Sequence, residues 1–114
     1  MESNSLQAAA VSALASLAQE HRLALFRLLV QAGSQGMAAG ALAGALGVPN
    51  SSLSFHLAHL NRAGLIDQRR EGRSLIYTAN YGAMNRLIGF LTDNCCGGAD
   101  CSTPARSAPG RKSA

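Results

Sequence analysis

The sequence predicts a mainly α-helical fold with one small β-hairpin. Of the 114 residues, 47% are apolar, Ala and Leu supply most of them, and Trp is absent. Ala and Leu favour helices, whereas sheet-rich cores usually carry β-branched and aromatic side chains. The chain has the length of one small domain. Because so small a core is marginal in a monomer, we expect a homodimer.

Two helices are predicted in the first third of the chain. Residues 5–18 are rich in Ala and carry apolar side chains on one side, and residues 19–21 interrupt this pattern. Residues 21–32 repeat apolar side chains at helical spacing, and Gly33 ends this helix. The two apolar stripes are Leu6, Ala10, Leu14 and Leu17, then Leu25, Phe26, Leu29 and Val30.

A pair of helices separated by a tight turn follows. The first spans about 38–46 and ends at Gly47, and Val48, Pro49 and Asn50 continue the turn. The second begins at Ser51 or Ser52, with Asn50 or Ser51 as its N-cap, and ends at Gly64.

A basic hairpin and a last helix complete the domain. The segments 65–70 and 74–78 alternate like strands around the turn 71–73. Asn80 then caps a helix over 81–93, which we expect to form the dimer together with helix 5–18. The expected core comprises Leu25, Phe26, Leu29, Leu46, Leu53, Leu57, Leu60, Leu65, Ile66 and Ile76.

This order of elements is that of a winged helix-turn-helix, which predicts binding to double-stranded operator DNA. Short polar side chains at the start of a recognition helix meet the major groove, and basic hairpin residues meet phosphates or the minor groove. The net charge of +4 adds little, because residues 1–102 carry seven Arg and six acids. The expected DNA contacts are Ser51, Ser52, Ser54, His56, His59, Arg62, Arg69, Arg70 and Arg73.

Each of these contacts has a purely structural alternative. Ser51 alone could serve as a helix cap. His56 flanks Leu57 and could be a packed, hydrogen-bonded side chain. Arg69 and Arg70 could belong to an ordinary solvated strand face. The combined order of motifs is stronger than any single residue.

The chain resembles the ArsR/SmtB family, whose members are dimeric winged-helix repressors released from DNA by metal or metalloid ions. The resemblance covers about residues 10–93 and is most specific in the Ser-Phe-His-Leu run at 54–57, the Ala-Gly-Leu run at 63–65 and the Glu-Gly-Arg run at 71–73. Further matching segments are 17–23, 42–48, 51–53, 58–60, Ile66, Arg70 and Tyr77. The resemblance implies the same fold, a homodimer and a DNA-binding function.

The chain departs from two known sensor sites of this family. Many arsenic-responsive members carry a Cys-Val-Cys motif before the recognition helix, where residues 41–46 here contain no cysteine. Zinc-responsive relatives place Asp and His pairs on the last helix, which here offers Asp93 and no His. A cysteine cluster after the last helix looks instead like the subgroup that senses trivalent arsenic or antimony.

The chain's three cysteines, Cys95, Cys96 and Cys101, form that cluster. Their number is odd and a disulfide between neighbours is strained, so we expect three reduced thiols. Three thiolates suit a three-coordinate thiophilic ion, whereas structural zinc usually takes four ligands. Adjacent residues of a helix project about 100° apart, so the backbone must leave helical geometry here, as Gly97 and Gly98 allow.

The expected function is therefore a cytoplasmic repressor of an arsenic or antimony resistance operon. Arsenic(III) or antimony(III) is the expected inducer, with no organic cofactor. Residues 1–93 form the DNA-binding and dimerisation domain, 94–101 the metalloid-binding segment, and 102–114 a disordered tail. No secretory leader or membrane span is evident.

Several alternatives stay open. The thiols could be incidental or form a redox switch, and Asp93 or Asp100 could complete a zinc site. A cytosolic ion buffer would not need the basic hairpin. An enzyme is not indicated, because four residues separate Cys101 from Arg106, where a phosphatase-type loop has five, and no Cys-x-x-Cys pair is present.

Overall fold

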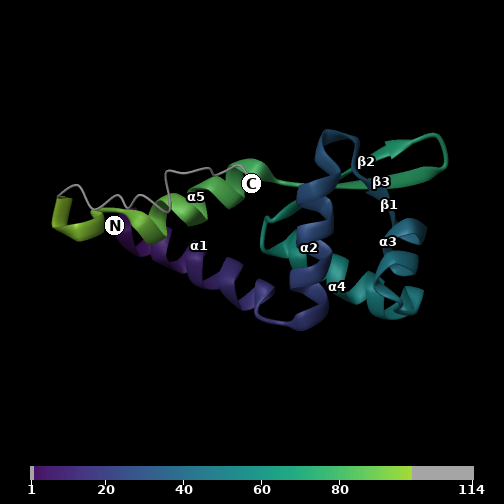
Figure 1. The fold of residues 1–114 in the computed structure, drawn as a ribbon, viewed down its shortest axis with the longest axis horizontal. Coiled ribbons are helices and arrows are strands. Elements are labelled where there is room, and N and C mark those ends of the chain that lie inside the picture. The colour runs from purple at the N-terminus through teal and green to yellow at the C-terminus, as the bar shows by residue number, and fades with distance from the viewer. Residues whose placement is uncertain (1, 99–114) are drawn as a thin grey trace, which may run out of the picture.

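The computed structural model describes residues 2–98, and it confirms a mainly helical fold with a small antiparallel sheet. Figure 1 shows α1 and α5 side by side at one end of the molecule, with the sheet and the other helices at the opposite end. No helix within the described residues is long and apolar enough to cross a membrane. The elements are α1 (Glu2–Leu17), α2 (Glu20–Ala32), η1 (Gly33–Gln35), β1 (Met37–Ala38), α3 (Ala39–Leu46), α4 (Asn50–Arg62), β2 (Ile66–Glu71), β3 (Ser74–Ala79), α5 (Tyr81–Thr92) and η2 (Cys95–Gly98).

Side-chain caps fix the starts of two helices. The Gln19 side chain accepts a hydrogen bond from the Arg22 backbone N–H at 2.9 Å, which turns the chain from α1 into α2. Asn80 accepts from the Ala83 N–H at 2.9 Å, so the predicted cap of α5 is confirmed. The predicted caps of α4 are wrong by one or two residues. Asn50 is already helical, and the preceding Pro49 provides no side-chain cap.

The sheet contains one strand more than the predicted hairpin. Its order is β1-β3-β2, and both pairings are antiparallel. β1 comprises two residues, and Met37 pairs with Tyr77 of β3. The prediction began the third helix at residue 38, which the structure instead places in β1. The hairpin itself is confirmed, and we call β2, β3 and their connecting turn the wing.

The hydrophobic core lies among α2, α3, α4 and the base of the wing. Eight of the ten predicted core residues are buried, whereas Leu46 and Ile76 are only partly buried. Tyr81 ties α5 to this core, because its hydroxyl donates to the Val30 carbonyl at 2.9 Å. The prediction omitted several buried positions, namely Ala10, Ala13, Leu42, Ala43 and Ala79.

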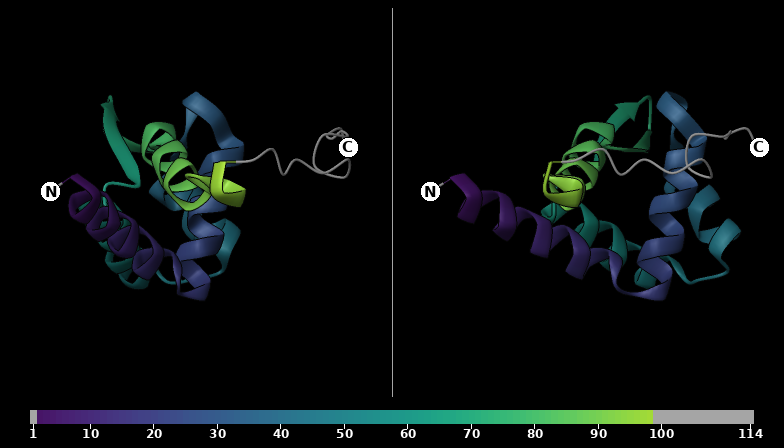
Figure 2. Two further views of the ribbon diagram at one scale, coloured as in Figure 1. Left: turned by 90° about the vertical axis from the view of Figure 1, so that its left-hand side faces the viewer. Right: turned by 60° about the vertical axis from the view of Figure 1, so that its left-hand side comes forward.

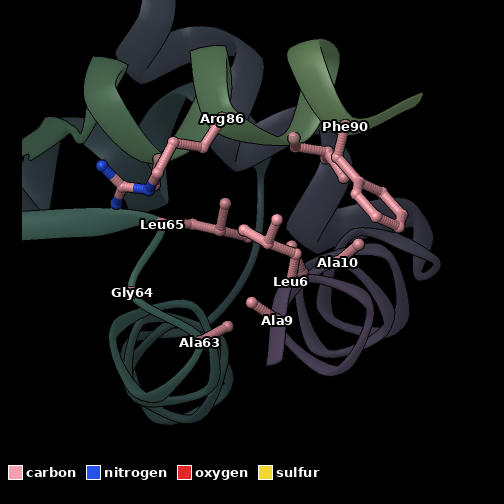
Figure 3. A pocket seen from close by; sticks show the side chains of 11 residues that line it. Leu6, Ala9, Ala10, Ala63, Gly64, Leu65, Arg86 and Phe90 are labelled. Carbon is pink, nitrogen blue, oxygen red and sulfur yellow. The ribbon is translucent and has the colours of Figure 1, made fainter. Parts of the chain in front are cut away.

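α1 and α5 leave much apolar surface uncovered within one chain. A hollow of about 140 Å³ opens between them near the end of α4, and Figure 3 shows Leu6 and Ala10 of α1 facing Phe90 of α5. Figure 2 shows that α1 projects away from the helix-turn-helix. The exposed large apolar side chains on the two helices are Leu6, Val11, Leu14, Ile88 and Leu91.

Candidate nucleic-acid interface

A three-residue turn sets the angle between α3 and α4. Gly47 ends α3 in the left-handed conformation, with φ of 68°, and its N–H donates to the Ala43 carbonyl at 2.8 Å. A residue without a Cβ adopts this conformation at little cost. Pro49 is extended and leads directly into α4. The first turn of α4 carries no acidic residue, so the positive end of its dipole is not neutralised there.

α4, which we call the recognition helix, has one buried and one exposed face. Leu53, Leu57 and Leu60 point into the core. Three of the predicted DNA contacts are fully exposed on the opposite face, namely Ser51, Ser54 and Arg62. A fourth, Ser52, is partly exposed. Phe55, Ala58 and Asn61 are exposed as well.

His56 does not belong to that exposed face, although its contact with DNA was predicted from the sequence. Its side chain is 8% exposed, and its ring lies 5.6 Å from the His21 ring, centroid to centroid. Burial, and then the nearby His21, Arg22 and His59, lower the pKa of His56 below its ordinary value. Its Nδ1 finds no hydrogen-bond partner among the described residues. The burial and the lowered pKa both favour the neutral imidazole at this position.

His59 connects the recognition helix to α1. It is partly buried, and its Nδ1 lies 3.1 Å from the Ser16 hydroxyl oxygen, a hydrogen bond whose direction depends on the tautomer. The Arg22 Nε donates to the Ser16 carbonyl at 2.6 Å. The predicted DNA contact of His59 thus competes with a bond inside the protein.

Arg69 is exposed, but its guanidinium is engaged in bonds within the chain, and its contact with phosphate stays a prediction. Its Nε donates to Glu71 Oε2 at 2.7 Å, and its two terminal nitrogens donate to the Ser34 and Gln35 carbonyls at 3.0 Å each. These bonds hold the base of the wing against η1.

Arg70 and Arg73 are the exposed cations that the wing offers to DNA. Successive side chains of a strand point to opposite faces, so Arg70 lies on the face opposite Arg69 and shares it with Gln68. That face is turned toward α4, because Gln68 and Tyr77 line a hollow of about 190 Å³ together with residues of α4. The prediction missed Gln68, which the strand alternation around Arg70 would have indicated. The α4 residues that line this hollow are Ser54, Leu57, Ala58 and Asn61.

Two of the predicted thiol ligands follow α5 in a non-helical turn. Asn94, Cys96 and Gly97 have positive φ, which confirms that the backbone leaves helical geometry at the cysteines. The sulfurs of Cys95 and Cys96 lie 3.7 Å apart. Cys96 is disulfide-bonded in this structure, so the expectation of three reduced thiols is not met there.

The complete predicted metalloid site extends beyond the described part of the chain. Cys101 and the predicted disordered tail, 102–114, both lie outside residues 2–98, as does Asp100. Within the described residues, no group of three or more His, Cys, Asp or Glu side chains is arranged to hold a metal ion. The structure therefore brings two of the three proposed ligands together.

An exposed polar helix face beside a basic wing defines a winged helix-turn-helix DNA-binding protein. A helix-turn-helix domain family matches residues 17–69. The HTH-type transcriptional regulator YgaV of Escherichia coli is 37% identical over 92 residues, which cover 80% of this chain and 93% of YgaV. The transcriptional activator HlyU of Vibrio cholerae is 35% identical over 91 residues, which cover 80% of each protein.

Solved structures with a similar fold identify the family more narrowly. A homodimeric winged helix-turn-helix DNA-binding domain from Mycobacterium bovis, a possible ArsR-family regulator, has a TM-score of 0.61 and 26% identity, covering 88% of this chain and 93% of that one. A possible transcriptional regulator for arsenical resistance has a TM-score of 0.63 and 25% identity, covering 78% and 97%. The chain belongs to the ArsR/SmtB family of transcription regulators. These relatives are described as regulators, not as enzymes.

Proposed function

We propose that two copies of this chain form a dimer that represses a metalloid resistance operon in the cytoplasm. The observation that carries DNA binding is the exposed face of α4, with Ser51, Ser54 and Arg62, next to the free cations Arg70 and Arg73 of the wing. Small hydroxyl side chains let the helix approach base edges closely, and the two arginines suit phosphates.

The apolar surfaces of α1 and α5 support the dimer. Both helices expose large aliphatic side chains that no other part of residues 2–98 covers. Burying them against a second copy removes this surface from water, and it sets two recognition helices at a fixed separation. Sedimentation at tens of micromolar should show a dimer, and a monomer alone would contradict this assembly.

The pair Cys95 and Cys96 supports sensing of trivalent arsenic or antimony, with Cys101 as the third ligand. The sulfurs of Cys95 and Cys96 lie 3.7 Å apart, so both can bind one thiophilic ion once Cys96 is reduced. The turn follows α5 directly, so ion binding there reshapes the end of a helix that contributes to the dimer surface. A coupling free energy of a few kcal/mol is enough for release from DNA.

A redox sensor of the same fold is the second candidate, because Cys96 is disulfide-bonded in this structure. In that case oxidation, and not metalloid binding, would change the turn after α5. The metalloid site, in contrast, requires the reduced thiols. The two proposals therefore differ in the state of the cysteines that releases DNA.

Gel shifts on the DNA just upstream of the gene separate these proposals. Protein reduced with a phosphine, which unlike dithiols leaves arsenite free, is titrated with arsenite, antimonite or zinc, and in parallel with a thiol oxidant. We expect release by arsenite or antimonite, whereas Cys96→Ser should bind DNA normally and ignore these ions. Release by the oxidant alone would favour the redox sensor. Failure of wild type to bind any tested DNA would contradict both.

Direction of regulation needs a separate measurement, because the relative HlyU is described as an activator. A reporter placed behind the bound DNA should be silent with the wild-type protein and active after arsenite is added. Reporter activity that requires the protein without inducer would make it an activator. The Arg73→Ala variant, which should bind weakly, provides the control for DNA dependence.

A further inference from the structure

Phe55 is an exposed aromatic side chain on the recognition helix, and its position calls for an apolar ligand. Its side chain is 60% exposed. Among the described residues, the other exposed large apolar side chains lie on α1, α2 and α5, away from the exposed face of α4. On that face Phe55 is flanked by Ser51, Ser54 and Ala58, which are small and leave the ring protruding.

The ring of Phe55 is supported by two histidines. It packs edge-to-face against His56, with ring centroids 5.6 Å apart, and against His59 at 6.3 Å. Both distances lie within the range of attractive aromatic pairs. His56 is held by burial and His59 by its bond to Ser16. The ring is therefore positioned before DNA arrives, and little conformational freedom is lost on binding.

The chemistry of the major groove leaves one natural partner for such a ring. Base edges present hydrogen-bond donors and acceptors there, which Phe cannot satisfy, and the one apolar group is the C5-methyl of thymine. The phosphates are charged and offer no apolar group, and the C–H groups of the deoxyribose do not differ among the four nucleotides. A ring placed against a polar base edge would remove water from that edge without replacing its hydrogen bonds.

We propose that Phe55 contacts the methyl group of one thymine in each half-site and thereby sets the base preference of the protein at that position. This inference rests on the proposed function, because it requires that α4 enters the major groove. It assigns sequence discrimination to an apolar residue, whereas the polar contacts Ser51, Ser54 and Arg62 chiefly orient the helix.

Replacement of thymine by deoxyuridine tests this contact, because it removes only the methyl group. The wild-type protein first selects its preferred duplex from a random-sequence pool. Each thymine of that duplex is then replaced singly, and Kd is measured at constant salt. Loss of one buried methyl should weaken binding about fourfold at one position per half-site.

Variants at two neighbouring positions make the test specific. Phe55→Ala should bind the thymine and deoxyuridine duplexes equally, whereas Phe55→Leu should keep part of the difference. The matched control Ser54→Ala lies on the same face, and it should weaken binding to both duplexes while keeping the difference. Phe55→Ala removes two aromatic pairs from an otherwise exposed side chain, so its unfolding midpoint should fall only modestly; a cooperative unfolding transition guards against misfolding.

Three outcomes would count against the inference, and a fourth counts against the proposed function itself. The inference is overturned if no thymine shows a methyl effect, if the effect persists in Phe55→Ala, or if Phe55→Ala binds DNA like wild type. If wild type selects no sequence from the pool, the proposed DNA-binding function fails, and that result is distinguishable from the other three.

Discussion

Arg69 and Arg73 are both arginines of the wing, but their replacement by Ala should affect different properties of the protein. The guanidinium of Arg69 makes an ion pair with Glu71 and two hydrogen bonds to backbone carbonyls of Ser34 and Gln35. Arg73 lies exposed in the turn of the wing. We therefore expect Arg69→Ala to lower stability and Arg73→Ala to weaken DNA binding.

The magnitude for Arg69 follows from its three contacts. An exposed ion pair contributes about 0.2–1 kcal/mol, and each exposed hydrogen bond adds about 0.5 kcal/mol, at the low end of the usual range. The free energy of unfolding should fall by about 1–2 kcal/mol. In a domain of this size, each kcal/mol lowers Tm by about 4–8 °C. Thermal melts must be compared at one protein concentration, because dimerisation stabilises the fold by mass action.

The salt dependence of DNA binding provides the second readout. Each phosphate contact adds about 0.9 to the slope of log Kd against log salt. Arg73→Ala should reduce this slope by about 0.9 per wing without changing Tm, and Arg69→Ala should leave it unchanged. Arg69→Lys keeps the charge but loses the forked geometry, so it should melt like Arg69→Ala. A reduced salt slope together with wild-type Tm in Arg69→Ala would refute the view that Arg69 chiefly stabilises the fold through its bonds within the chain.

Three further changes test the core, the buried histidine and the junction before β1. Leu57→Ala should cost roughly 2–5 kcal/mol in urea unfolding, because Leu57 is 4% exposed; a wild-type midpoint would place it on the surface. The lowered pKa of His56 means that the unfolded chain binds more protons below its ordinary value of 6.5, so stability should be full above that pH and decline below it. His56→Gln should flatten this decline, and an unchanged pH profile would argue against burial of a neutral ring. Gly36→Ala should destabilise more than Gly33→Ala, since both have positive φ but only at Gly36 would a Cβ meet the Tyr77 carbonyl oxygen; equal midpoints would argue against that close approach.

Helices and the hairpin could be predicted because each depends on local periodicity. The apolar stripe of α2 and the alternation of β3 lie within short segments, and the structure confirms both. β1 could not be found in this way. It has two residues, and only its pairing with Tyr77 and Ile76, which are distant in sequence, makes it a strand.

The site was predicted less completely, because exposure depends on packing between helices. Ser51 and Ser54 are exposed as the recognition-helix pattern suggests. His56 lies one residue before Leu57, on the part of α4 that packs against the α1–α2 junction, and the sequence alone left a packed histidine open as an alternative. Arg69 stays exposed, but carbonyls of η1 accept hydrogen bonds from its guanidinium, and no local pattern encodes the position of η1.

The hydrogen bond between Ser16 and His59 links the recognition helix directly to the end of α1. Ser16 is buried at the end of α1, and its carbonyl is held by Arg22 of the following helix. A tilt of α1 therefore moves the second half of α4 through this bond, and the wing takes no part in it. In a dimer formed through α1 and α5, the distance between the two recognition helices becomes a property of the α1 helices. A change of a few ångströms at the far end of the molecule is then enough to take both helices out of register with successive grooves.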